Sequence, residues 1–103
     1  MKLYSLLSLL FLAGCTQPII ANESYSLAEI SLHNTSSDCW IIINNSVYDI
    51  TEYVSMHPGG GSILQGCGTN STILFETRPS GSNTPHSTNA RNTLINYLLG
   101  EVE

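Results

Sequence analysis

The sequence has little charge, and positive charge is especially scarce. Of its 103 residues 11% are charged, with three Lys and Arg against eight Asp and Glu. Such a surface repels the phosphates of nucleic acids and anionic lipid headgroups, and it favours basic protein partners. We therefore expect no nucleic acid among the partners.

Several cofactor motifs are also missing. No Cys-x-x-Cys-His occurs, which excludes the usual covalent attachment of c-type haem. The glycines at 59–61 are not followed by Lys-Ser or Lys-Thr, so they do not form a phosphate-binding loop. No further ligand stands at a short spacing from His57 or His86, so a zinc site fits poorly.

No apolar run is long enough to cross a bilayer. Leu3–Leu12 is apolar but too short for a transmembrane helix. It follows Met1-Lys2 and precedes Leu12-Ala13-Gly14-Cys15, which is the layout of an export signal with a small-residue cleavage site. The tetrapeptide resembles the lipobox of bacterial lipoproteins, in which the cysteine is lipidated and becomes the new N-terminus. An ordinary secretory signal with a chance cysteine is the alternative.

These features predict a signal peptide over 1–14, a lipidated N-terminus and tether over 15–25, and a folded domain over 26–103. Removing 1–14 leaves two Arg against eight acidic residues, a net charge of 2 − 8 = −6. Thr16 after Cys15, by resemblance to Gram-negative sorting, favours the outer membrane. We expect an exported protein, lipid-anchored at the periplasmic side of the outer membrane or at the cell surface.

The residues after the tether predict one hairpin and several short helices. The S-x-x-E pattern at 26–29 is a capping box at a helix start. The apolar, β-branched segment 39–43 predicts a buried strand, and 47–50 predicts its return strand after an Asn-rich turn. Further short helices are expected over these segments: 51–56, 62–65 and 71–76.

The C-terminal part predicts a loop and then a last helix. The composition of 78–85 is that of a loop. The helix starts near Ser87, and Gly100 is its expected stop. Its apolar face comprises Ala90, Leu94, Tyr97 and Leu98. Together the elements indicate an α+β fold in which a small sheet carries a basket of short helices.

Two histidines stand beside turns in this arrangement. His57 follows a predicted helix and precedes Pro-Gly-Gly, and His86 precedes the last helix. Imidazole is a good iron ligand, and two of them leave no iron position open for a substrate. On the residues alone, surface or structural histidines remain the alternative.

The order of the motifs resembles the haem-binding domain of cytochrome b5 over about residues 26–102. The resemblance is carried by these segments: Asp38-Cys39-Trp40-Ile41, Val47-Tyr48-Asp49-Ile50-Thr51, His57-Pro58-Gly59-Gly60, Phe75, and His86-Ser87 with Ala90-Arg91. The His-Pro-Gly-Gly motif within this order is highly specific. A related steroid-binding family shares the fold but lacks the histidine pair, and it matches less well.

The resemblance implies a non-covalent haem b with six-coordinate iron, held between two helix pairs. His57 and His86 match the axial ligands, and Ser87 matches a position that hydrogen-bonds a haem propionate. Ile42 and Ile43 stand on the strand that forms the floor, and Trp40 belongs behind the pocket. The residues matching the cleft lining are Tyr53, Ile63, Leu64, Phe75, Ala90 and Leu94.

Three features lie outside this pattern. The loop 78–85 is longer than in the best-known members, which puts the propionate contacts on that side in doubt. Cys39 and Cys67 remain after lipidation of Cys15, and they fit either a disulfide or two buried thiols. His33 is expected to be exposed and not to be a ligand.

The resemblance implies an electron carrier anchored to a membrane surface. Haem storage, haem sensing and a purely structural haem are the alternatives. We do not expect an enzyme, because the chain has no flavin or nicotinamide domain and no open metal position. The expected partner is a basic redox protein or a membrane reductase.

Overall fold

A computed structural model describes residues 23–103, which form a small mixed sheet with short helices. The sheet order is β1-β6-β4-β3-β2, with β5 paired to β3. The strands are β1 (Ser24–Tyr25), β2 (Asn34–Thr35), β3 (Asp38–Ile43), β4 (Ser46–Asp49), β5 (Thr69–Asn70) and β6 (Leu98–Val102). The α-helices are α2 (Leu27–Leu32), α3 (Thr72–Thr77) and α4 (Thr88–Leu94), and the 3-10 helices are η1 (Thr51–Met56), η2 (Gly60–Gly66) and η3 (Ile95–Tyr97). This confirms the predicted α+β fold.

The predicted hairpin is the centre of the sheet. β3 and β4 are antiparallel, with Trp40 opposite Asp49 and Ile43 opposite Ser46. Asn44 and Asn45 make the turn with φ of 50° and 73°. A two-residue turn of this kind needs positive φ at both positions, and Asn tolerates the left-handed region better than most residues.

β3 divides the hydrophobic core into two clusters. Side chains alternate between the two faces of a strand. Ile41 and Ile43 therefore pack on one side with Cys39, Ile50 and Cys67. The second cluster, on the other side, contains Ile30, Ile42 and Val47, with Tyr25, Trp40, Leu99 and Val102 packed against it.

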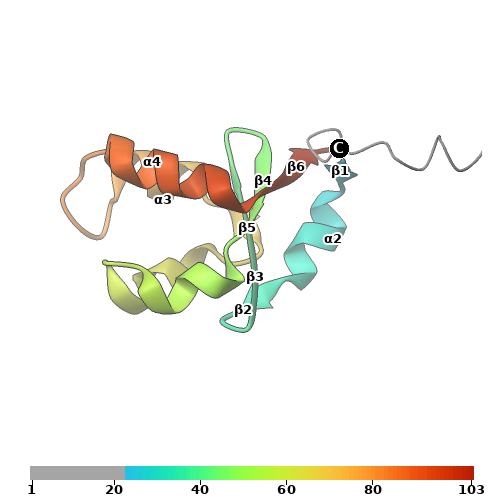
Figure 1. The fold of residues 1–103 in the computed structure, drawn as a ribbon, viewed down its shortest axis with the longest axis horizontal. Helices are drawn as coiled ribbons and strands as arrows, with labels where there is room; N and C mark the ends of the chain where they lie inside the picture. Colours follow the sequence, from blue (N-terminus) through green and yellow to red (C-terminus); the bar gives the residue numbers. More distant parts are fainter. Residues whose placement is uncertain (1–22) are drawn as a thin grey trace, which may run out of the picture.

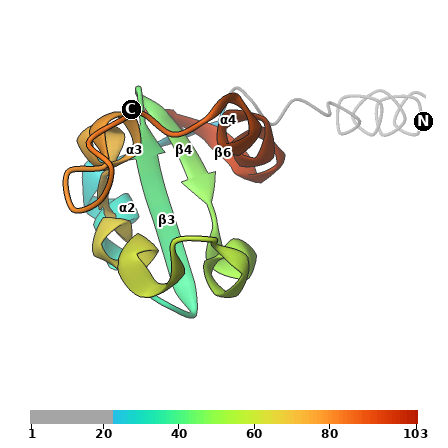
Figure 2. The same ribbon diagram turned by 90° about the vertical axis from the view of Figure 1, so that its left-hand side faces the viewer.

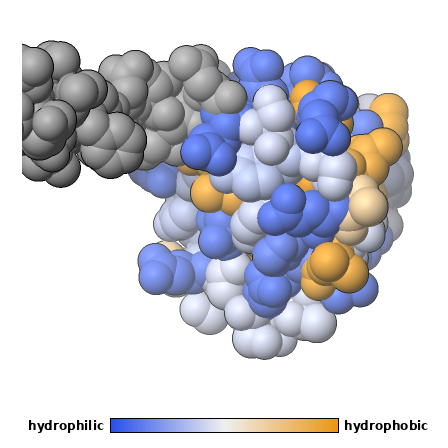
Figure 3. Space-filling view, turned by 90° about the vertical axis from the view of Figure 1, so that its right-hand side faces the viewer, coloured by the Kyte–Doolittle hydropathy of each residue, from blue (hydrophilic) through white to orange (hydrophobic). Residues whose placement is uncertain are grey.

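The short helices stand on the first of these faces. α3, α4, η1 and η2 surround the space in front of β3 and β4, whereas α2 and β1 lie at the other end of the molecule (Figures 1 and 2). The visible part of that other end is mainly hydrophilic, with hydrophobic residues in separate patches (Figure 3). Within residues 23–103, no helix has the length and hydropathy needed to cross a membrane.

The sheet begins just before the predicted start of the domain at residue 26. Ser24 and Tyr25, assigned to the tether, form β1 and pair in parallel with Glu101 and Val102. Ser26 then caps α2, its Oγ accepting a hydrogen bond from the Glu29 amide at 3.0 Å. The predicted signal peptide 1–14 and Cys15 lie outside the described residues.

The C-terminal helix ends earlier than expected. Leu98 and Gly100, predicted as part of the helix and its stop, both lie in β6. Gly100 is opposite Val47 in β4, and a Cβ at this glycine would clash with the backbone of Glu23. Gly100 therefore permits close packing of three strands and does not end a helix.

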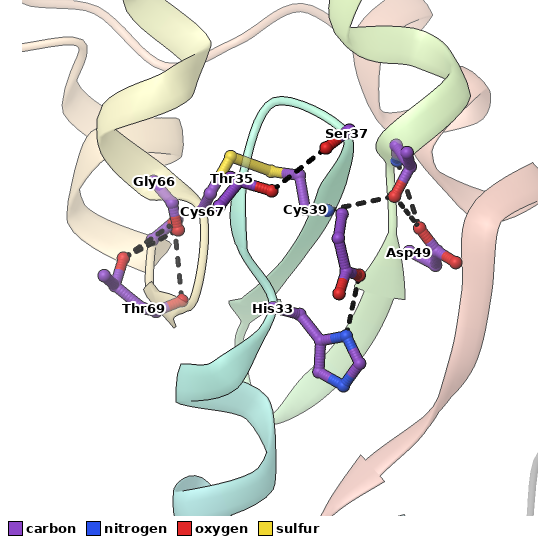
Figure 4. Close-up of a disulfide and its surroundings, with 11 residues drawn as sticks. His33, Thr35, Ser37, Cys39, Asp49, Gly66, Cys67 and Thr69 are labelled. Carbon is purple, nitrogen blue, oxygen red and sulfur yellow. Dashed lines mark hydrogen bonds and ion pairs between the residues drawn. A yellow bond between two sulfur atoms is a disulfide. The ribbon is translucent and has the colours of Figure 1, made fainter.

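Cys39 and Cys67 form a disulfide (Figure 4). Their Cα atoms are 4.8 Å apart, at a sequence separation of 28. Cys39 lies on β3 and Cys67 is the C-cap of η2. The bridge therefore fastens the end of η2 to the central strand, which rules out the alternative of two free thiols.

Candidate haem site

A cavity of about 890 Å³ lies on the helix-covered face of β3. Its floor is made by Ile41, Ile43 and Ile50. The helices and the segment before α4 supply most of the walls, including Tyr53, His57, Ile63, Leu74, Phe75, His86, Ala90, Leu94 and Tyr97. An apolar cleft with a few polar groups is the usual form of a cofactor site.

His57 is held by the backbone that follows it. It is the C-cap of η1, and its Nδ1–H donates to the carbonyl oxygen of Gly60 at 3.1 Å. Gly60 has a φ of +68°, which favours glycine. A Cβ at Gly59 would come within 2.7 Å of Cε1 in the His57 ring. The two glycines therefore let the chain turn back onto the imidazole and fix its orientation.

His86 is held by α3. Its Nδ1–H donates to the carbonyl oxygen of Phe75 at 2.8 Å, and its amide donates to the same oxygen at 3.0 Å. The Phe75 ring also stacks on the imidazole, with 4.4 Å between centroids and 8° between planes. Ser87 caps α4 by accepting a hydrogen bond from the Ala90 amide at 3.2 Å.

Both imidazoles are in the same tautomer. A carbonyl oxygen can only accept, so each Nδ1 carries a proton, and in the neutral imidazole each Nε2 then keeps a free lone pair. The structure gives neither Nε2 a hydrogen-bond partner among residues 23–103. Hydrogen bonding of one ring nitrogen to a carbonyl is the usual support of a histidine that ligates a metal through the other nitrogen.

The spacing of the two rings suits one metal ion between them. Their centroids are 6.3 Å apart and their planes differ by 28°. Two metal–nitrogen bonds of about 2 Å each, plus the distance from each ring centre to its nitrogen, fill a gap of this size. Within the described chain, no three His, Cys, Asp or Glu side chains are grouped to hold a metal. The pair therefore fits a metal whose other ligands come from its own prosthetic group, as in haem.

Most of the predicted lining residues face the cavity, but two do not. Ile43, Tyr53, Ile63, Phe75, Ser87, Ala90 and Leu94 are at its wall. Ile42 points to the opposite face of β3 and packs with Ile30 and Val47. Leu64 is 42% exposed and lies outside the lining. Ile41 takes the place assigned to Ile42, because neighbouring side chains on a strand face opposite sides.

The loop 78–85 forms part of the cavity wall, which the sequence did not indicate. Residues 78–82 line the cavity. Arg78, in the left-handed conformation at the C-cap of α3, ties the loop together. Its guanidinium donates to the Thr84 carbonyl at 2.9 Å, to Thr84 Oγ1 at 2.8 Å and to the Pro85 carbonyl at 2.9 Å. The loop is thus braced directly before His86.

His33 was wrongly predicted to be exposed. Its side chain is 23% exposed, and its ring stacks on Trp40 with 3.6 Å between centroids. Its Nδ1 is 2.7 Å from Oδ1 of Asp38 (Figure 4). Trp40 itself packs in the cluster behind the cavity, as expected, so His33 lies on the far side of β3 from the other two histidines.

Comparison with known proteins identifies the family. A family model described as "Cytochrome b5-like Heme/Steroid binding domain" matches residues 26–103. The soluble cytochrome b558 of Ectothiorhodospira shaposhnikovii is 41% identical over 80 residues, covering 77% of this chain and 86% of the relative. A cytochrome B5-like protein of Arabidopsis thaliana is 38% identical over 86 residues, covering 84% of this chain and 66% of that protein, just under two thirds of its length.

A solved structure is also similar. Cytochrome b558 of Ectothiorhodospira vacuolata, described as a prokaryotic homologue of cytochrome b5, superimposes with a TM-score of 0.73 at 38% identity. The match covers 78% of this chain and 98% of that one. Since the family model spans the whole described sheet except β1, together with both cavity histidines, the chain belongs to the cytochrome b5-like haem-binding family.

Proposed function

We propose that this chain is an electron carrier that binds haem b through His57 and His86. The observation that carries the proposal is the pair of imidazoles on one apolar cavity, each with Nδ1 bound to a carbonyl and Nε2 unpartnered among the described residues. The haem iron supplies the one-electron chemistry. Held by His57 and His86, the haem would have no iron position left for an exchangeable substrate, so the arrangement favours electron transfer over catalysis.

We propose a basic redox protein as the partner, or a membrane reductase with a basic contact surface. The −6 charge of the chain after residue 14 supports attraction to such a surface. Glu52 is exposed and lies at a hollow that also includes Asp38, Asp49 and Tyr97. Tyr97 lines both this hollow and the main cavity, so a partner contacting Glu52 comes close to the haem position.

Electron transfer should therefore depend on salt. We expect the haem-loaded protein to be reduced and reoxidised reversibly, and its association rate with a small basic acceptor to fall as salt rises. Charges further apart than about 8 Å are largely screened at physiological ionic strength. Stopped-flow absorption across a salt series measures both quantities. Steering changes mainly the association rate.

A pair of charge variants locates the contact. Glu52→Gln should lower the low-salt rate about two- to fivefold, whereas Glu29→Gln, the same change on α2 and away from the hollow, should not. A rate independent of salt would contradict electrostatic steering. A haem that exchanges electrons slowly with every acceptor would favour storage or sensing over electron transfer.

We propose that the mature chain is held at a membrane surface by lipid on Cys15. The lipobox-like Leu12-Ala13-Gly14-Cys15 supports this proposal. The position of β1 supports it too, because this first strand, which begins at Ser24, lies at the end of the domain away from the cavity (Figure 1). Multiple acyl chains anchor firmly, whereas a single one binds marginally.

The anchor is tested by fractionation. The wild-type protein should sediment with membranes, and Cys15→Ser should remain uncleaved by the lipoprotein route. Asn92→Ala, an exposed change that leaves the disulfide intact, should keep the membrane location. A mature N-terminus at another residue, found by mass spectrometry in soluble protein, would refute the proposal.

A further inference from the structure

Arg91 on α4 reaches across to α3, one turn beyond His86. Its guanidinium binds Glu76 at both carboxylate oxygens, with Nη1–Oε2 at 2.9 Å and Nη2–Oε1 at 2.5 Å. Hydrogen bonding from Arg91 lowers the pKa of the Glu76 carboxyl. The flat, two-pronged contact is one that Arg makes and Lys does not. Glu76 is therefore paired within the domain, and its charge is compensated by Arg91.

The same guanidinium packs on an aromatic ring. The Arg91 Cζ atom lies 5.2 Å from the centroid of Phe75, over the ring. Phe75 is also the residue whose ring stacks on His86 and whose carbonyl oxygen receives the His86 Nδ1–H. Arg91 and Glu76 thus fix the position of Phe75, which orients His86 both through its ring and through its carbonyl oxygen.

The α3 end of this chain of contacts is also fixed to the hairpin turn. The side-chain Nδ2 of Asn44 donates to Glu76 Oε2 at 3.5 Å, and the backbone amide of Asn44 donates to Thr72 Oγ1 at 2.9 Å. The Arg91 and Glu76 side chains are 43% and 28% exposed, respectively. An ion pair this exposed contributes only modestly to stability, although its bidentate geometry is the favourable case, so its effect on geometry has to be measured apart from its effect on stability.

We propose that Arg91 is a positioning residue for the second axial ligand: held by Glu76, it keeps Phe75 packed on His86 and so sets the orientation of the His86 ring toward the haem iron. The proposal rests on the proposed function. The identity of the two ligands does not fix the orientation of the His86 ring. The proposal assigns that orientation, and its effect on the electronic state of the iron, to this ion pair.

Substitutions of Arg91 separate positioning from stability. In the haem-loaded full chain, Arg91→Gln should change the g-values of the ferric low-spin electron paramagnetic resonance spectrum. It should also speed haem transfer to excess apomyoglobin about three- to tenfold. Arg91→Lys should give an intermediate result, because Lys pairs with Glu76 but cannot lie flat on Phe75. Asn92→Ala, an exposed change on the same helix, is the control and should do neither.

The wild-type spectrum decides the proposed function, and the difference between variants decides the role of Arg91. A wild-type ferric protein without a low-spin signal from two nitrogen ligands would overturn both. With that signal present, unchanged g-values in Arg91→Gln would overturn the positioning role. That conclusion stands even if Arg91→Gln releases haem faster. Faster release that is accompanied only by a lower unfolding midpoint would mean that the ion pair stabilises the fold and does not orient His86.

Discussion

His86→Ala and His57→Ala are each expected to convert a low-spin haem protein into one that is high-spin or haem-free. Each change removes one nitrogen from the pair whose ring centroids are 6.3 Å apart. Because losing a supporting contact of a metal ligand already costs 10- to 100-fold in affinity, losing the ligand itself should weaken haem binding by at least ~100-fold. Any haem retained should bind carbon monoxide rapidly, whereas the wild-type protein should bind it poorly.

Absorption spectra of the oxidised, reduced and carbon monoxide-treated proteins measure this effect. His33→Ala is the matched control, because it removes the third histidine, which stacks on Trp40 behind the cavity. The control should keep the wild-type spectrum in both oxidation states. An unaltered low-spin spectrum in His57→Ala or His86→Ala would show that another residue ligates the iron. Rapid carbon monoxide binding by the wild-type protein would contradict two strong axial ligands.

Reduction of the Cys39–Cys67 disulfide is expected to lower the free energy of unfolding by about 3–4 kcal/mol. The bridge joins two residues at a sequence separation of 28. The conformational entropy that the unfolded chain loses when a loop of this length is closed corresponds to about 3–4 kcal/mol. In a domain of this size such a loss lowers the unfolding midpoint by about 15–25 °C. Because small domains are only marginally stable, much of the haem-free chain should then unfold near body temperature.

Thermal and urea unfolding with and without a thiol reductant measure the effect, and Cys39→Ala/Cys67→Ala separates its causes. Both cysteines are buried, so the double variant loses packing as well as the cross-link and should be at least as destabilised as the reduced protein. Haem should raise the midpoint of every form. A loss below about 1 kcal/mol on reduction would show that the unfolded chain gains little freedom from opening this loop.

Local patterns in the sequence were sufficient for most of the fold. The capping box at Ser26, the Asn44-Asn45 turn and the apolar segment of β3 each reflect interactions between near neighbours, and each is found where it was predicted. The histidine pair was assigned through the resemblance to cytochrome b5, and the Pro-Gly-Gly context that carries it at His57 has a geometric cause in Gly59 and Gly60.

Long-range contacts could not be predicted in the same way. Ser24–Tyr25 is too short to be recognised as a strand, and only pairing with β6 orders it. Leu98 continues the helical pattern of α4 but pairs instead with Tyr48. The continuous apolar segment 41–43 has no polar residue to mark which face is inward, so Ile42 was placed on the wrong side. A polar composition identified 78–85 as a loop but could not show that Arg78 folds it onto the cavity.

The parallel pairing of β1 with β6 determines how the domain can be joined to other proteins. Ser24 lies opposite Glu101, and the Glu103 amide donates to the Tyr25 carbonyl oxygen at 2.8 Å. Both ends of the described fold therefore leave from one edge, at the end opposite α3, α4 and the loop between them (Figure 1). A lipid, a linker or a whole second domain attached at either end leaves the haem cavity open to solvent. The domain can therefore be joined to an anchor or to another domain without obstructing its cofactor site.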